Sequence, residues 1–176
     1  MLTLSAHTGG MTPCIPFLAA LGLAVAGCSE KPAPQSATPT FYRSLAAQGA
    51  TIDPAAARDM ISIYRANNGL PVLTVDPALQ RAAQQRAQEM VKAGAASPDT
   101  PQKLKARLAS EGISAGVAVE NVSAGYHTLA EAFSGWRQSS SHNANMLNRS
   151  ATRMGIATAY APDSKYKVYW ALVLAN

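Results

Sequence analysis

The stretch MGIATAYAPDSKYKVYWALVL, residues 154–174, gives the clearest indication of the fold. Two runs rich in β-branched and aromatic residues, 154–160 and 166–174, flank the sequence PDS at 162–164, which favours a turn. This spacing predicts a β-hairpin. In the second run both alternating sets of side chains are apolar, so the hairpin is predicted to supply the central strands of a sheet that is covered on both faces.

Helix-capping signals recur upstream of the hairpin. Asp53 and Asp76 each precede a proline, which predicts that each caps a helix beginning at that proline. Residues 67–69, Asn-Asn-Gly, end the first predicted helix and Gly94 ends the second, because these residues tolerate a left-handed backbone. A weaker helix is predicted from Pro101 to about residue 109.

A Val-rich β-like segment, residues 116–122, and a further helix lie between that helix and the hairpin. Thr128 and Glu131 form a capping box that opens this helix, which accounts for Glu131 without a catalytic role. Its Trp136 and the hairpin's Trp170 are predicted to be core anchors. Helices first and a long hairpin last predict an α+β fold, with helices packed on an antiparallel sheet.

Four local motifs follow one another along the chain: YRANNGLPVLTVDPALQRAA (64–83), ENVSAGYHTLAEAFSGW (120–136), SSHNANML (140–147) and TRMGIATAY (152–160). In this order they resemble the CAP superfamily, also called the SCP domain, which includes cysteine-rich secretory proteins, antigen 5 and plant pathogenesis-related proteins. The bacterial members are the most similar. The resemblance implies a CAP-type α-β-α sandwich.

The resemblance also implies a shallow central cavity in which two His and two Glu can hold a divalent metal. By position, Glu120 matches the first Glu and His142 the second His, whereas Pro98 stands at the other His position and residues 137–139, Arg-Gln-Ser, stand where the second Glu is expected. The implied cavity is therefore reduced. We expect His142 to face Glu120 and share one hydrogen bond with it, so that the carboxylate raises the pKa of the imidazole.

Other chemistries around this cavity stay open. Two asparagines are expected to support it by hydrogen-bonding buried backbone groups: Asn121 and Asn145. A serine hydrolase would need a G-x-S-x-G nucleophile elbow, which the polar turn predicted around His142 lacks, and spacing selects neither Asp99 nor Asp163 to orient the imidazole. A metal site needs three or four ligands, so Glu120 and His142 alone predict no cofactor or a weakly held divalent metal. No catalytic residue is assigned.

The first 28 residues differ in composition from the rest. No charged residue lies between Cys14 and Cys28, and the apolar run has the length of a signal-peptide core, shorter than a membrane span. Its end, VAGC at 25–28, resembles a bacterial lipoprotein lipobox, which implies cleavage before Cys28 and lipid attachment to it; an ordinary secretory signal is the alternative. The expected parts are a lipoprotein signal peptide over 1–27, a lipid-anchored tether rich in Pro, Ser and Ala over 28–50, and the CAP domain over 51–176.

The net charge of +5 comes from basic residues dispersed along the chain, without an aromatic-basic module, so no nucleic-acid partner is expected. The expected function is that of a monomeric, lipid-anchored CAP-domain lipoprotein on the periplasmic or extracytoplasmic face of the bacterial envelope. It would be a binding or accessory module for a lipid, a cell-wall component or another extracytoplasmic ligand, held to the membrane by its lipid anchor. The alternative is a weakly metal-dependent hydrolase using Glu120 and His142. An apolar groove beside residues 93–99 would favour lipid, and a pocket with convergent polar groups would favour the alternative.

Overall fold

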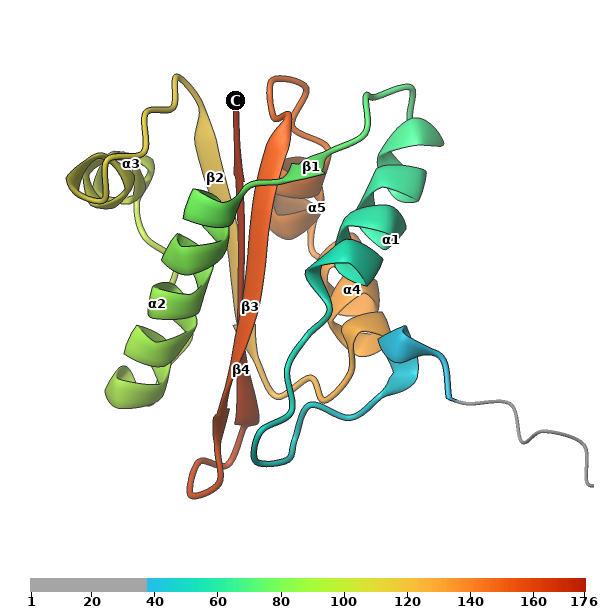
Figure 1. The fold of residues 1–176 in the computed structure, drawn as a ribbon, viewed down its shortest axis with the longest axis vertical. Helices are drawn as coiled ribbons and strands as arrows, with labels where there is room; N and C mark the ends of the chain where they lie inside the picture. The colour runs from blue at the N-terminus through green and yellow to red at the C-terminus, as the bar shows by residue number, and fades with distance from the viewer. Residues whose placement is uncertain (1–37) are drawn as a thin grey trace, which may run out of the picture. The chain divides into compact units, whose positions relative to one another are not determined.

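The computed structural model describes residues 38–176, and Figure 1 traces their arrangement. The predicted signal peptide, Cys28 and the rest of the predicted tether up to residue 37 lie outside the described residues. No helix within 38–176 is both long enough and apolar enough to cross a membrane. The elements in chain order are a short 3-10 helix η1 (Thr40–Tyr42), α1 (Pro54–Ala66), β1 (Thr74–Val75), α2 (Pro77–Ala93), α3 (Pro101–Ser110), β2 (Ala118–Ala124), α4 (Leu129–Gln138), α5 (Ser140–Met146), β3 (Arg153–Ala161) and β4 (Lys167–Ala175).

The helix-capping predictions are confirmed. Asp53 Oδ1 accepts hydrogen bonds from two backbone N–H groups of the first turn of α1, at 2.9 and 3.2 Å, and Asp76 Oδ1 does the same for α2, at 2.8 and 3.1 Å. Gly94 follows α2 with φ of 67°, a left-handed conformation that glycine adopts without strain. Thr128 and Glu131 form both hydrogen bonds of the capping box that opens α4.

The sheet has four strands in the order β1-β3-β4-β2. The predicted hairpin is present, and β3 and β4 occupy the centre as expected. β2 pairs antiparallel with β4, but β1 pairs in parallel with β3 through Thr74 and Val75. The sheet is therefore mixed, whereas the sequence predicted an antiparallel one. Two residues are too few for a strand periodicity to appear in the sequence, and β1 is held by main-chain hydrogen bonds to the distant β3 end.

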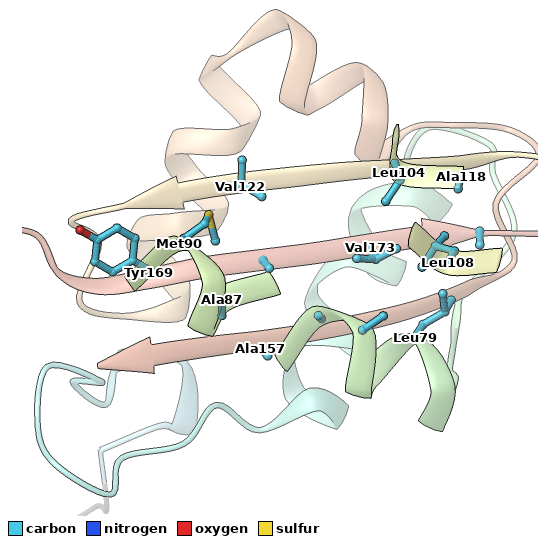
Figure 2. Close-up of a cluster of buried hydrophobic side chains, with 14 of the residues drawn as sticks. Leu79, Ala87, Met90, Leu104, Leu108, Ala118, Val122, Ala157, Tyr169 and Val173 are labelled. Carbon is cyan, nitrogen blue, oxygen red and sulfur yellow. The ribbon is translucent and has the colours of Figure 1, made fainter. Parts of the chain in front are cut away.

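One face of the sheet is covered by α2 and α3, and the other by α1, α4 and α5 (Figure 1). Figure 2 shows the core on the first face, where α2 and α3 pack on alternate side chains of β2, β3 and β4. The opposite set of β4 side chains, including Trp170, enters the second core, where Trp136 meets Trp170 edge to face with ring centroids 6.1 Å apart. Both tryptophans are fully buried, as predicted, and the α-β-α sandwich is confirmed.

Two segments differ from the sequence-based expectation. The serine- and asparagine-rich stretch around His142 was predicted to be a polar turn, but it forms the helix α5, whose Met146 is fully buried. Leu45 lies within the predicted tether, yet its side chain is buried in the second core and its N–H donates to the His127 carbonyl at 2.7 Å. In both places tertiary contacts outweigh a composition that favours turns or linkers.

Candidate functional site

A small pocket opens at the β2 edge of the sheet, between the loop that follows α2, the start of α3, and α5. Its volume is about 120 Å³. Pro98 lies in its wall, at the position where the family resemblance places a histidine, and Glu120 lies in the same wall. The lining residues are Pro98, Asp99, Pro101, Leu104, Ala118, Val119, Glu120 and Asn145.

The strand alternation of β2 decides where Glu120 points. Glu120 is paired with Val173 of β4, and its neighbours at two-residue spacing, Ala118 and Val122, pack in the core under α2 and α3. Side chains of one strand alternate between the two faces of a sheet. The Glu120 side chain therefore lies on the α2 and α3 side, and only 5% of the residue is exposed.

Both carboxylate oxygens of Glu120 already have partners. Oε1 accepts a hydrogen bond from the Asp99 backbone N–H at 2.6 Å, and Oε2 accepts one from Arg107 Nη2 at 3.0 Å. Arg86 Nε lies 3.6 Å from Oε2 on the other side. The carboxylate is thus enclosed by two guanidinium groups and a main-chain donor.

Asp99 extends this ion-pair cluster. Its carboxylate lies 3.2 Å from Arg107 Nε, 2.8 Å from Lys103 Nζ and 3.6 Å from Arg86 Nη2. Arg86 also donates to the Ser97 carbonyl. The cluster, defined by Arg86, Asp99, Lys103, Arg107 and Glu120, joins α2, the loop after it, α3 and β2.

Burial and charge act in opposite directions on the two carboxylates of the cluster. Burial raises the pKa of Glu120 despite the nearby Arg86 and Arg107. Burial also opposes ionisation of Asp99, but its contacts with Lys103, Arg86 and Arg107 outweigh that effect and lower its pKa. Asp99 is therefore the more firmly ionised of the two carboxylates.

His142 does not meet Glu120, and the predicted hydrogen bond between them is absent from the described part of the chain. His142 belongs to α5, which packs on the opposite face of the sheet from the Glu120 side chain. Burial lowers the pKa of its half-buried imidazole, and no carboxylate among the described residues offsets this effect. The expectation of a raised His142 pKa is therefore wrong, because the sheet separates the two side chains.

The two predicted supporting asparagines do lie where α5 meets β2. Asn121 Nδ2 donates to the His142 carbonyl at 3.0 Å. Asn145 Nδ2 donates to the Glu120 carbonyl at 2.8 Å and to Asn121 Oδ1 at 3.0 Å. These bonds satisfy backbone groups at the sheet edge and fix the position of α5, so that the main chains of Glu120 and His142 are linked although their side chains are not.

The residues present do not fit a divalent metal. Within residues 38–176 no three His, Cys, Asp or Glu side chains converge as a metal site requires. A cation at Glu120 would also meet the guanidinium of Arg107, whose Nη2 lies 3.0 Å from the carboxylate, and like charges at such distances repel strongly. Arg137, near the second expected Glu position, instead places its guanidinium 5.1 Å from the ring centre of Tyr64.

A nucleophilic arrangement is not assembled around His142 either. Ser139 Oγ and Ser141 Oγ lie 3.3 Å apart and pair with each other. No serine hydroxyl of the described residues bonds to the imidazole, and Asp99 is engaged in the ion-pair cluster. The other aspartate considered as an orienting acid, Asp163, lies in the β3–β4 turn. Neither aspartate therefore orients the His142 imidazole.

Arg86 and Arg107 are the site residues that the sequence-based reasoning missed. Arg86 had a recognisable signal, because it falls within the apolar stripe of α2, three residues after Ala83 and four before Met90. An arginine on a core-facing stripe needs buried partners. Arg107 lies close to the apolar Leu104 and Leu108 in the sequence, but this position did not indicate that its side chain pairs with Glu120.

Residues 58–174 match the model of CAP, the cysteine-rich secretory protein family. No curated protein matches the sequence. Among solved structures, the fold is similar to an extracellular protein containing a SCP domain from Bacillus anthracis, with 24% identity and a TM-score of 0.59 over 70% of this chain and 40% of that chain. It is also similar to a cysteine-rich secretory protein from Staphylococcus aureus, with 18% identity and a TM-score of 0.56 over 69% of this chain and 37% of that one.

A third similar structure is an outer surface protein from Borrelia burgdorferi, with 18% identity and a TM-score of 0.61 over 73% of this chain and 98% of that chain. This chain thus spans less than half the length of the first two proteins and matches nearly all of the third. At these identities the likeness concerns the fold alone. The family match covers most of the described sandwich, including the pocket at Glu120, and the chain belongs to the CAP family of cysteine-rich secretory proteins.

Proposed function

We propose that this chain is an extracytoplasmic CAP domain, anchored to the bacterial envelope by lipid at Cys28, that works as a metal-independent binding or accessory module. Its ligand class is a lipid or a cell-wall component, and no catalytic step is assigned to Glu120 or His142. The alternative is the weakly metal-dependent hydrolase.

The ion-pair cluster around Glu120 carries this proposal. A carboxylate that acts as a metal ligand or a general base needs a free oxygen directed at the ion or the substrate. Both Glu120 oxygens accept hydrogen bonds from the protein, one of them from Arg107. Using this carboxylate for chemistry would mean breaking a buried ion pair, which costs several kcal/mol, about 3–5 in typical cases. The cluster therefore favours a structural role for the cavity and a binding role for the domain.

The location and the anchor have separate support. Two of the similar structures are described as an extracellular protein and an outer surface protein. In this chain the sequence VAGC at 25–28 follows an uncharged apolar run and precedes a Pro-rich stretch. Each buried methylene of an acyl chain contributes about 0.8 kcal/mol to membrane binding, so two or more chains would hold the domain firmly.

A thermal-shift screen of the mature chain tests the binding role. The melting temperature should be unchanged by ZnCl₂ or EDTA and should rise with a phospholipid, a fatty acid or a peptidoglycan fragment, because a ligand of the native state stabilises it. A rise with micromolar Zn²⁺ that His142→Gln abolishes would instead support the hydrolase. His127→Gln is the matched control, since His127 is the other histidine after the proposed cleavage site and lies exposed before α4.

Metabolic labelling with a fatty-acid analogue tests the anchor. The wild-type chain should be labelled and should fractionate with membranes, whereas Cys28→Ala should be unlabelled. Cys14→Ala is the control, because Cys14 is removed with the proposed signal peptide and its loss should leave labelling intact. An unlabelled and freely soluble wild-type protein would contradict the anchor.

A further inference from the structure

An apolar surface runs along one flank of α1, from partly buried residues that pack against the second core to exposed residues on η1 and α1. A groove of about 550 Å³ runs between η1 and α1, and Phe41, Ala56, Met60 and Ile63 supply most of its lining. Tyr42 continues this surface, with its ring centre 4.7 Å from that of Phe41. We call Phe41, Tyr42, Met60 and Ile63 the α1 outer face.

The exposure of the α1 outer face is unusual for this domain. Within residues 38–176 three large apolar side chains are exposed, and two belong to this face: Tyr42 at 59% and Ile63 at 63%. The third, Val72 at 62%, follows α1 in the chain. The opposite side of α1 already supplies Ala57 and Ile61 to the core. Phe41 and Met60 also pack against this core, so the apolar surface continues from the core out to the exposed Tyr42 and Ile63. A contiguous apolar surface that reaches solvent in this way marks a contact surface.

The position of this surface in the chain indicates what it contacts. The groove includes Pro39 and Thr40, so the chain reaches the domain at the groove itself. Cys28 precedes Pro39 by 11 residues in the sequence. An extended chain spans about 3.3–3.6 Å per residue, so the proposed lipid lies within about 40 Å of the groove along the tether. This reach allows the α1 outer face to contact the membrane that the proposed lipid enters.

We propose that the α1 outer face rests on the lipid bilayer that holds the anchor, which orients the domain on the membrane. This proposal rests on the proposed lipidation of Cys28. The face has the composition of a membrane-interface contact, in which aliphatic side chains and an aromatic ring with a polar tip enter the headgroup region. Arg43 is exposed beside Tyr42 and can extend its guanidinium to lipid phosphates.

The charges beside the groove are compatible with an anionic membrane surface. The acidic residue in its wall, Asp59, is paired with Arg58 at 2.6 Å, so its charge is compensated. The contact itself need not be strong. Linking two binding parts through a short connection gives an effective concentration in the millimolar range, so a surface with only millimolar affinity for lipid is occupied much of the time. The Glu120 pocket opens at the β2 edge of the sheet, shares no lining residue with this groove, and stays free to bind a ligand.

Site-specific labelling of the lipidated chain tests the docking. The chain has only Cys14 and Cys28, of which one is removed with the proposed signal peptide and the other carries the lipid, so an introduced cysteine is the only free thiol. We would place an environment-sensitive fluorophore at Ile63→Cys and, as control, at Ala106→Cys, which is exposed on α3 across the sheet (Figure 1). Each labelled protein would be added to vesicles of phosphatidylethanolamine and phosphatidylglycerol, prepared with and without nitroxide-labelled lipid.

The label at position 63 should emit at shorter wavelength on vesicles and should be quenched by the nitroxide lipid, and the label at position 106 should do neither. Tyr42→Ser in the Ile63→Cys chain should shift the emission back toward that in water. Vesicle-bound, lipidated protein with equal, unquenched emission at both positions would overturn the docking and leave the anchor intact. Absence of fatty-acid labelling at Cys28 would overturn the anchor and the docking together. A shift at position 63 without vesicles, accompanied by a dimer in light scattering, would assign the face to a second copy of the chain.

Discussion

Two adjacent residues of β2 have opposite surroundings. Glu120 points toward α2 and α3 and is held by Arg107, whereas Asn121 points toward α5 and binds the His142 carbonyl. Successive side chains of a strand lie on opposite faces, so Glu120 lies in the layer of α2 and α3, whereas Asn121 lies in the layer of α5, the helix that carries His142. The two residues that the family resemblance pairs are thus not electrostatic neighbours in this chain.

This separation predicts how His142 titrates. Its pKa should lie below its ordinary value of 6.5, because burial disfavours the charged imidazole, and Glu120→Gln should leave it unchanged. The folded state then binds the His142 proton less readily than the unfolded state. The stability that His142 contributes is present above pH 6.5 and is lost as the pH falls through its folded pKa. NMR titration of both proteins, with His127→Gln to assign the signals, measures this; a pKa above 6.5 that falls in Glu120→Gln would contradict it.

Arg65 is a second residue whose role depends on distant partners. Its side chain is fully buried, and no carboxylate within residues 38–176 pairs with it. It donates to four carbonyls, those of Pro71, Met146, Asn148 and Ala151, at 2.8 to 2.9 Å. The planar guanidinium thus joins α1 to the chain that leads from α5 into β3.

Arg65→Lys should therefore destabilise the protein although the charge is kept. A lysine ammonium has three donors at one point and cannot reach all four carbonyls, and each buried group left unpaired costs about 1–3 kcal/mol, so we expect a loss of about 3 kcal/mol. Urea unfolding of the variant measures the loss. Arg149→Lys, at an exposed position near the same loop, is the control and should leave the unfolding free energy nearly unchanged.

At the scale of elements, the packing of α2 on the sheet depends on a glycine in β3. A Cβ atom added to Gly155 would overlap the main-chain carbonyl of Leu79 in α2. Next to it, the Gln80 side chain exchanges two hydrogen bonds with the main chain of Ile156, at 2.5 and 3.0 Å. Helix and strand backbones are therefore in direct contact here, and neither can move as a flexible side chain would.

Gly155→Ala should accordingly destabilise the domain by about 1–3 kcal/mol, the usual cost of overpacking a close-packed core. Thermal and urea unfolding measure the change. Gly116→Ala is the matched control, because a Cβ there would meet only the Asn176 side chain at 3.4 Å, which is an ordinary contact distance. Equal stability of the two variants would show that α2 can withdraw from β3 without cost.

At the scale of the whole molecule, the sandwich includes the segment between the tether and α1. Leu45 is 7% exposed and packs in the core beneath α1 and α4, and its N–H bonds to the His127 carbonyl. The second core thus contains a residue that lies before the predicted domain boundary at residue 51.

A chain that begins at Thr51 should therefore be less stable than one that begins at Ser36, by about 2 kcal/mol, the contribution of burying one leucine side chain. The midpoint of urea unfolding compares the two. Leu45→Ala in the longer chain should reproduce most of the loss. If the two chains unfold at the same urea concentration, the segment before residue 51 is dispensable for the sandwich.

Features that depend on neighbouring residues could be predicted from the amino-acid sequence. The capping aspartates with their prolines, the Thr128–Glu131 capping box and the apolar alternation of the hairpin each act within a few residues, and each forms as predicted. The ordered motifs also identified the family, and with it the sandwich. Local rules were sufficient there, because hydrogen bonds at helix ends and the side-chain periodicity of strands do not depend on distant partners.

The ion-pair partners of Glu120 could be identified only in the folded structure. Arg86 and Arg107 come from two helices, and Asp99 comes from the loop between them, so no spacing in the sequence brings them to one carboxylate. The helix at His142, the parallel strand β1 and the buried Leu45 likewise depend on contacts with segments far away in the chain. The physical reason is that burial and ion pairing are properties of the packed layers, and the sheet that forms those layers also separates Glu120 from His142.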